Sequence, residues 1–109
     1  MKLVIEDDLF TMSNLSPKRT GLPFVVWISP RDGAQHDVRV KISRSPRATP
    51  GEFISVTVRP TVAVVNGVLS NHELALLRKW IELNREVLVK FWEGEIEYTE
   101  DVLAQLQSI

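Results

Sequence analysis

The two histidines are the residues of this sequence best suited to chemistry, and their positions argue against a catalytic or metal centre. His36 lies in an alternating segment, on the same predicted strand face as Val38 and Val40, which places it at the top of the core or at its rim. His72 falls in the first turn of a predicted helix, exposed to solvent. A zinc site needs several histidine or cysteine ligands at set spacings, and the chain has no cysteine. We therefore expect no catalytic residue, no metal and no cofactor.

Other catalytic signatures are also missing from the sequence. It has no nucleophile motif of the G-x-S-x-G type and no glycine-rich loop that would cradle a phosphate. Five carboxylates lie between residues 93 and 101, a run more typical of a solvated connector than of an acid–base pair or a cation site. An enzyme is not expected. The weakest alternative is a hydrolase-type enzyme with an unrecognised site near His36.

Basic residues concentrate in the middle of the chain and provide the best candidate for a binding surface. Residues 16–69 contain eight Lys or Arg and three acidic residues, whereas residues 70–109 contain four basic and eight acidic residues. Cations beside an aromatic ring suit single-stranded nucleic acid, and they equally suit an acidic protein or the acidic region of a second copy. A sequence pI of about 6.1 is low for a nucleic-acid-binding domain, so a protein partner is favoured. The candidate binding surface is Trp27, Arg39, Lys41, Arg44, Arg47 and Arg59.

A long amphipathic helix is the clearest element that would position these side chains. An apolar stripe with a period of three to four residues runs through residues 70–94. Ser70, followed three residues later by Glu73, predicts a capping box at the start of the helix, and Gly94 predicts its end. A stripe that carries two tryptophans and a phenylalanine needs a large apolar surface, which the rest of the chain must supply.

Asn84 lies on the apolar stripe of this helix, seven residues after Leu77 and seven before Phe91. A buried amide must be hydrogen-bonded. We expect a bond to a carbonyl at a strand end or in a loop. The alternative is that Asn84 sets the register of a helix–helix interface, as polar residues do in coiled coils.

The segment before the helix predicts an antiparallel sheet. A turn at Pro30–Gly33 joins an apolar run to an alternating one, as in a hairpin. Asn66 and Gly67 predict a second, tight hairpin, in which Val68 and Leu69 pair back briefly before the helix begins. The strands predicted before residue 70 are residues 24–28, 35–43, 53–59 and 61–65, with a further short strand at residues 3–5.

These elements predict one α+β domain over residues 1–109, with a three- to four-stranded antiparallel sheet, a long helix and a short C-terminal helix. Residues 24–69 form the β-rich half and residues 70–109 the helical half. Residues 11–23 are interpreted as a connector, and the sequence leaves open whether residues 1–15 are ordered. No apolar run approaches the ~20 residues that cross a bilayer, and the acidic N-terminus is unlike a signal peptide. We expect a cytoplasmic protein.

The order of these motifs resembles a family of small bacterial proteins with a domain of unknown function, sometimes encoded beside toxin–antitoxin genes. The resemblance covers about residues 24–94. It departs from the family at Ala34–Asp37, which has one histidine where the family often has two, and a site built on paired histidines lacks its second ligand here. The resemblance implies an antitoxin-like or regulatory accessory role. It is carried by His36, Val40, Val65, Gly67, Val68, Leu69, Leu74, Trp80, Ile81, Glu82, Leu83, Asn84, Leu88, Trp92 and Glu93.

The sequence therefore predicts a small non-enzymatic module that acts through protein–protein contacts, with a protein partner or self-association. No small-molecule ligand and no membrane contact are expected. A nucleic-acid-binding module that uses the basic sheet face is the main alternative.

Overall fold

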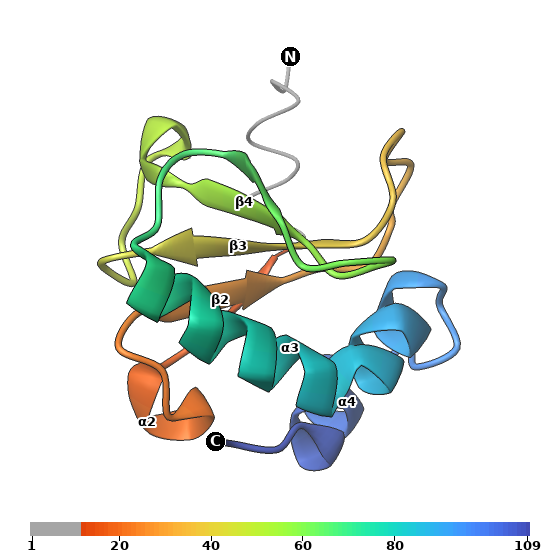
Figure 1. The fold of residues 1–109 in the computed structure, drawn as a ribbon. Coiled ribbons are helices and arrows are strands. Elements are labelled where there is room, and N and C mark those ends of the chain that lie inside the picture. The colour runs from red at the N-terminus through yellow and green to blue at the C-terminus, as the bar shows by residue number, and fades with distance from the viewer. Residues whose placement is uncertain (1–11) are drawn as a thin grey trace.

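One antiparallel sheet crossed by one long helix makes up most of the computed structural model, which describes residues 12–109 (Figure 1). Each strand lies beside the next one in the sequence, so the order in space is β1-β2-β3-β4-β5. The strands are β1 Ser13–Leu15, β2 Val25–Ile28, β3 Arg39–Ser43, β4 Ile54–Thr57 and β5 Val64–Asn66. The helices are α2 Pro17–Thr20, α3 Asn71–Trp92 and α4 Thr99–Gln105, with a 3-10 turn at Pro50–Glu52.

The predicted α+β class is confirmed, but the predicted strand count is wrong, because the sheet has five strands rather than three or four. The additional strand is β1, which lies in the stretch interpreted as a connector. Its three residues show no hydrophobic alternation, and they form a strand because Leu15 pairs with Val26 of β2 and is almost fully buried. The predicted strand at residues 3–5 lies outside the described residues.

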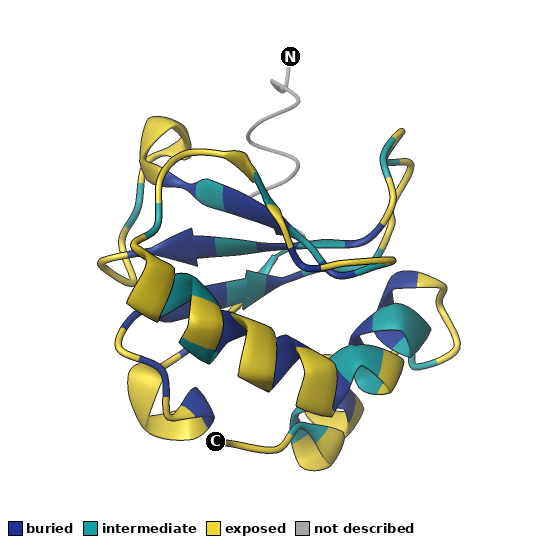
Figure 2. Ribbon diagram, viewed as in Figure 1, coloured by how far each residue is buried: buried dark blue, intermediate teal, exposed yellow. Residues whose placement is uncertain are grey.

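The core lies between α3 and one face of the sheet, called here the inner face. Strand parity places Val26, Val40 and Val56 on this face, and all three are at most 1% exposed. Leu77 and Trp80 of α3 are fully buried in the same apolar cluster. In Figure 2 the buried residues of α3 face the sheet and the exposed ones face away from it. The amphipathic stripe predicted from the sequence therefore covers the inner face.

The predicted ends of α3 are confirmed. Ser70 is the N-cap, its hydroxyl accepts from the Glu73 amide, and the Glu73 carboxylate completes the capping box. Gly94 follows the helix with φ 84°. Arg85 is half-buried, and its Nε donates to the Val58 carbonyl oxygen at 3.0 Å.

The predicted pairing of Val68 and Leu69 with β5 is wrong. After Gly67 the chain runs directly to the start of α3, and β5 is the edge of the sheet. Gly67 has φ 92°, and a Cβ atom there would lie 2.9 Å from Cγ1 of Ile54. Glycine is therefore required both by the positive φ and by the close approach to β4.

Candidate binding site at the end of the sheet

The connection between β2 and β3 brings polar side chains to one end of the sheet. Asp32 (φ 42°) and Gly33 (φ 81°) are both left-handed, and the Ala34 amide donates to the Arg31 carbonyl at 2.8 Å. Two consecutive residues with positive φ are typical of a type I′ turn, whose twist suits a hairpin. The Arg31 amide also donates to the Trp92 carbonyl at 3.1 Å, so the turn is attached to the last residue of α3.

His36 packs on Trp92 at this end of the sheet. The ring centroids are 5.5 Å apart and the ring planes meet at 24°. Nδ1 of His36 lies 2.7 Å from the main-chain oxygen of Asp37. Because a carbonyl can only accept, Nδ1 carries the proton, and Nε2 is left as an acceptor when the ring is neutral. The half-buried His36 is thus at the rim of the core, and no carboxylate among the described residues bonds to its ring.

An ion-pair network lies beside His36. The Arg59 guanidinium donates two hydrogen bonds to the Asp37 carboxylate and one to Glu93, all at 2.9 Å. The bonds from Arg59, followed by one from the Val38 amide, lower the pKa of Asp37 to about 2. The network joins the ends of β3 and β4 to the residue that follows α3.

The opposite face of the sheet, called here the outer face, carries polar and aromatic side chains. The Trp27 ring meets Phe53 edge-on, with centroids 5.3 Å apart. The Trp27 Nε1 donates to the Ser43 hydroxyl at 2.8 Å, and the Lys41 Nζ lies 5.9 Å from the centroid of Phe53. These contacts fix the rings of Trp27 and Phe53 relative to β3.

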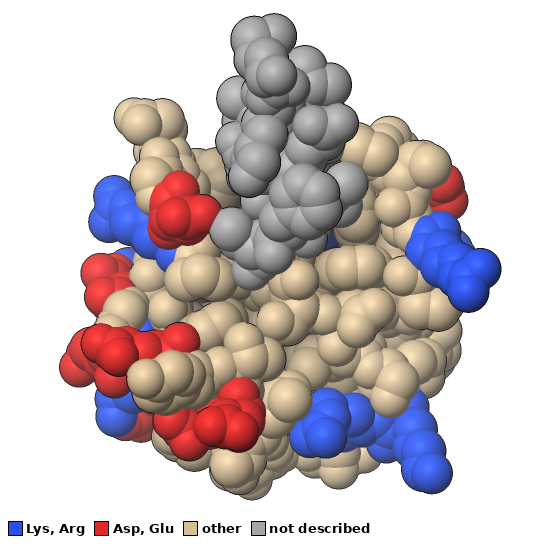
Figure 3. All heavy atoms as spheres, turned by 180° about the vertical axis from the view of Figure 1, so that it is seen from behind, with Lys and Arg blue, Asp and Glu red and all other residues tan. Residues whose placement is uncertain are grey.

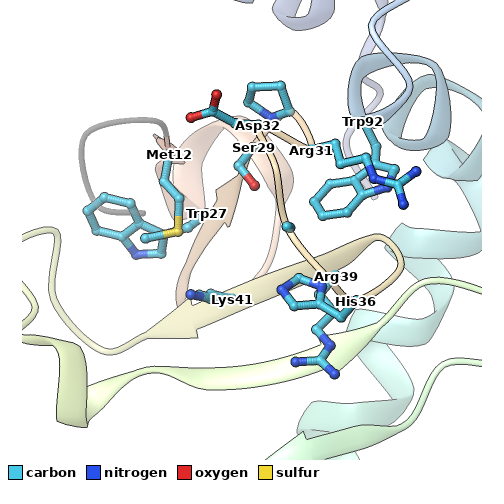
Figure 4. A pocket seen from close by; sticks show the side chains of 11 residues that line it. Met12, Trp27, Ser29, Arg31, Asp32, His36, Arg39, Lys41 and Trp92 are labelled. Atoms are coloured by element: carbon cyan, nitrogen blue, oxygen red, sulfur yellow. The ribbon is translucent and has the colours of Figure 1, made fainter. Parts of the chain in front are cut away.

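A hollow of about 30 Å³ opens where the outer face meets this end of the sheet (Figure 4). Met12 and Trp27 lie on one side and Trp92 on the other, with Lys41 on β3 between them and His36, just before β3, near Trp92. Among the described residues, the lining contains three cations, Arg31, Arg39 and Lys41, and one carboxylate, Asp32. We call this space the outer-face hollow.

The predicted basic surface is divided by the structure. Trp27, Arg39 and Lys41 come together at the outer-face hollow, whereas Arg59 belongs to the network with Asp37 and Glu93. The Arg44 guanidinium forms two hydrogen bonds with Glu73 at the start of α3, the longer of them 3.1 Å. Arg47 is exposed in the β3–β4 loop. Seen from behind, the acidic side chains gather mainly on the side where α3 meets α4 (Figure 3).

Sequence reasoning missed several contributors to the hollow, among them Arg31, Ser29 and Trp92. Arg31 was treated only as a turn residue, Ser29 was not considered, and Trp92 was assigned to the core. Trp92 is indeed 2% exposed, but it also forms one wall of the hollow. The Arg31–Asp32–Gly33 turn signal next to an apolar strand was the one hint that a cation would lie at this end of the sheet.

Asn84 bonds to a loop carbonyl, the kind of partner favoured from the sequence. Its Nδ2 donates to the carbonyl oxygens of Trp80 and Gln107, both at 2.9 Å, and its Oδ1 accepts from the Gln107 amide at 2.7 Å. The side chain is 1% exposed. Asn84 therefore holds the segment after α4 against α3, and Figure 1 shows this segment passing on toward α2.

Within residues 12–109, no three His, Cys, Asp or Glu side chains lie close enough together to hold a metal ion. None of the helices in the same range combines the length and the apolar composition needed to cross a membrane.

Comparison with known proteins gives one match. The model of a family described as Domain of unknown function (DUF4160) matches residues 48–93, which contain β4, β5 and α3. No curated protein and no solved structure matches the chain. Over residues 48–93 the chain is thus similar to a domain of unknown function. This range lies inside residues 24–94, over which the sequence resembles such a family.

Proposed function

We propose that this chain is a small association module that binds an acidic segment of a protein partner at the outer-face hollow. One observation carries the proposal: cations surround a small hollow that has tryptophan walls. A carboxylate of the partner enters the hollow, and the surrounding cations orient its neighbours.

The charges of Arg31 and Arg39 support an anionic group in the hollow. Asp37 and Glu93, the carboxylates of the ion-pair network beside His36, are both bound by Arg59. The Arg39 guanidinium forms no hydrogen bond or ion pair with another described residue. In Figure 4 the Arg39 and Arg31 side chains extend outward at the rim. Rim cations of this kind increase the rate of association with an acidic surface and select against basic ones.

The size of the hollow favours a carboxylate over a nucleobase. A cavity needs about 10–15 Å³ to hold one water molecule, so a hollow of about 30 Å³ has room for only a few atoms. A carboxylate tip fits such a space, whereas a base would have to lie outside it. The aromatic walls reduce water access, and a charge-assisted hydrogen bond is stronger where water is excluded.

The biological role that we propose is that of an antitoxin-like or regulatory accessory protein. The support is the resemblance to domain-of-unknown-function proteins that are sometimes encoded beside toxin–antitoxin genes. In this role the hollow recognises a partner protein and carries out no chemistry.

The proposal is tested with an acidic peptide rich in Asp and Glu, and with the matching Asn and Gln peptide. Binding is followed by calorimetry and by tryptophan fluorescence, since Trp27 and Trp92 line the hollow. We expect the acidic peptide alone to bind, and Arg39→Glu/Lys41→Glu to weaken its binding at least about tenfold, or ~1.4 kcal/mol. The matched control is Lys18→Glu/Arg19→Glu, which reverses two exposed charges on α2.

Two results would contradict the proposal. Equal weakening by the two double reversals would mean that only the overall charge matters. Tight binding of mixed-sequence RNA or DNA at physiological salt, below about 10⁻⁶ M and abolished by Arg39→Glu/Lys41→Glu, would instead support the nucleic-acid alternative. We expect nucleic acid to bind no tighter than ~10⁻⁵ M, the ordinary strength of non-specific binding.

A further inference from the structure

The β5 edge of the sheet is apolar and uncharged. Between Arg59 and Glu73 the sequence has no Asp, Glu, Lys or Arg, although these make up 25% of the chain. Val65 is 47% exposed and Val68 is 82% exposed, two of the few large apolar side chains at the surface of the described residues. In Figure 2 the segment from β5 to the start of α3 is mostly exposed.

This apolar edge is continuous with the core. Ile54, Val64 and Leu69 are half-buried and pack against the apolar cluster under the sheet. Val65 and Val68 extend this apolar surface outward into solvent. Proteins usually protect an exposed edge strand with charged residues, especially lysine, because its free backbone groups pair with other strands. The β5 edge has no charged residue, although it is short, with three residues and a register shift against β4. No strand of residues 12–109 covers it.

We infer that the β5 edge pairs with the β5 edge of a second copy, antiparallel across a twofold axis. Such an interface uses the same surface on both copies and needs a surface that complements itself. An uncharged, apolar edge satisfies this requirement, since neither copy brings a like charge to the contact. The net charge of −1 adds little repulsion between copies. The two sheets become one continuous sheet, and the valines of each copy cover those of the other.

The geometry of the edge supports pairing with a separate chain. The chain leaves β5 at Gly67 and enters α3 at Asn71, so no strand of residues 12–109 occupies the outer side of β5. Strand addition at a sheet edge draws its affinity from main-chain hydrogen bonds and its specificity from side-chain contacts. The outer-face hollow lies toward β2 and β3, so pairing at β5 and binding at the hollow involve different residues.

The inference is tested by sedimentation of the full chain over a range of concentrations. We expect the wild type to form a dimer of twice 12.4 kDa and Val65→Lys/Val68→Lys to be monomeric with unchanged circular dichroism. The matched control is Leu83→Lys, which places a lysine at an exposed apolar position of α3 (45% exposed) and should remain dimeric. If the double variant fails to fold, Val68→Lys alone replaces it, because a side chain 82% exposed has few contacts to lose.

Hydrogen exchange gives a second measurement on the wild type. Pairing at β5 should slow amide exchange at residues 64–68 as the protein concentration rises, while exchange elsewhere on the surface stays constant. A wild type that remains monomeric at ~100 µM, where a micromolar dimer would be nearly complete, would overturn the inference. So would a dimer that survives the lysines at 65 and 68, or a complex that forms only with a different protein.

Discussion

The two faces of the sheet use the same strands for different purposes. On the inner face, Val26, Val40 and Val56 alternate with outward neighbours and are closed off by α3. On the outer face, Trp27 and Lys41 make polar and ring contacts and border a hollow. Because successive strand residues point to opposite faces, changes on one face leave the other largely intact. The inner face should therefore determine stability, and the outer face should be free to determine what the protein binds.

The largest expected effect is on the helix residues that cover the inner face. Leu77→Ala and Ile81→Ala should each lower the free energy of unfolding by about 2–5 kcal/mol, because both side chains are fully buried and their loss leaves a cavity. Urea unfolding measures this difference.

Lys79→Ala is the control on the exposed side of α3 and should cost well under ~1 kcal/mol. Arg85 is unsuitable as a control because it bonds to the Val58 carbonyl. Similar losses in the Lys79 and Leu77 variants would mean that the two sides of α3 are wrongly assigned.

The core-facing residues of the sheet and of α3 were predictable from the sequence. The helical periodicity of residues 70–94 and the strand alternation of residues 35–43 and 53–59 can be read from the local chain. The alternating strand is shorter than predicted, because the chain bends at Gln35 and His36, where His36 packs on Trp92 of α3. β1 was missed because Ser13–Leu15 has no pattern of its own and becomes a strand only by pairing with β2.

The binding surface on the outer face was harder to predict, because it depends on which charged side chains form ion pairs in the folded chain. Arg44 and Arg59 carry the same charge as Arg39, and nothing in their local sequence shows that carboxylates from α3 and its end reach them. Trp92 lies on the apolar stripe as predicted, but only the folded chain brings it to the wall of a hollow. Trp27 and Lys41 are register partners in β2 and β3, and Arg39 lies two residues before Lys41, on the same face by strand parity.

A smaller effect is expected where the two faces meet, at the Asp37–Arg59–Glu93 network. The pKa of Asp37 falls to about 2 from its usual 3.8, so this carboxylate stabilises the fold above about pH 4 and the contribution is lost as the pH falls toward 2. Asp37→Asn should lower stability at pH 7 by ~0.2–1 kcal/mol, since the side chain is 51% exposed and screened.

The same variant should also lose less stability on acidification than the wild type does, in urea unfolding measured from pH 7 to pH 2. Some acid dependence should persist, because bonds from Arg44 and the Ser70 amide lower the pKa of Glu73 to about 2 as well. Glu100→Gln, at an exposed carboxylate of α4, is the control. An acid profile of Asp37→Asn that matches the wild type would show that the network does not stabilise the fold.

The smallest expected effect on stability is at the outer face itself. Arg39→Glu/Lys41→Glu should change the free energy of unfolding by less than about 1 kcal/mol, because both residues are only half-buried and surface substitutions rarely cost more. The contact of Lys41 with Phe53 contributes ~0.5–1 kcal/mol, as an exposed cation–π pair does. Urea unfolding of this variant, beside the Leu77→Ala variant, compares the two faces directly. If the double reversal costs as much as the core substitution, Arg39 and Lys41 stabilise the sheet, and weaker peptide binding by the variant would reflect damaged structure. If its stability is nearly unchanged, weaker binding is a property of the hollow alone.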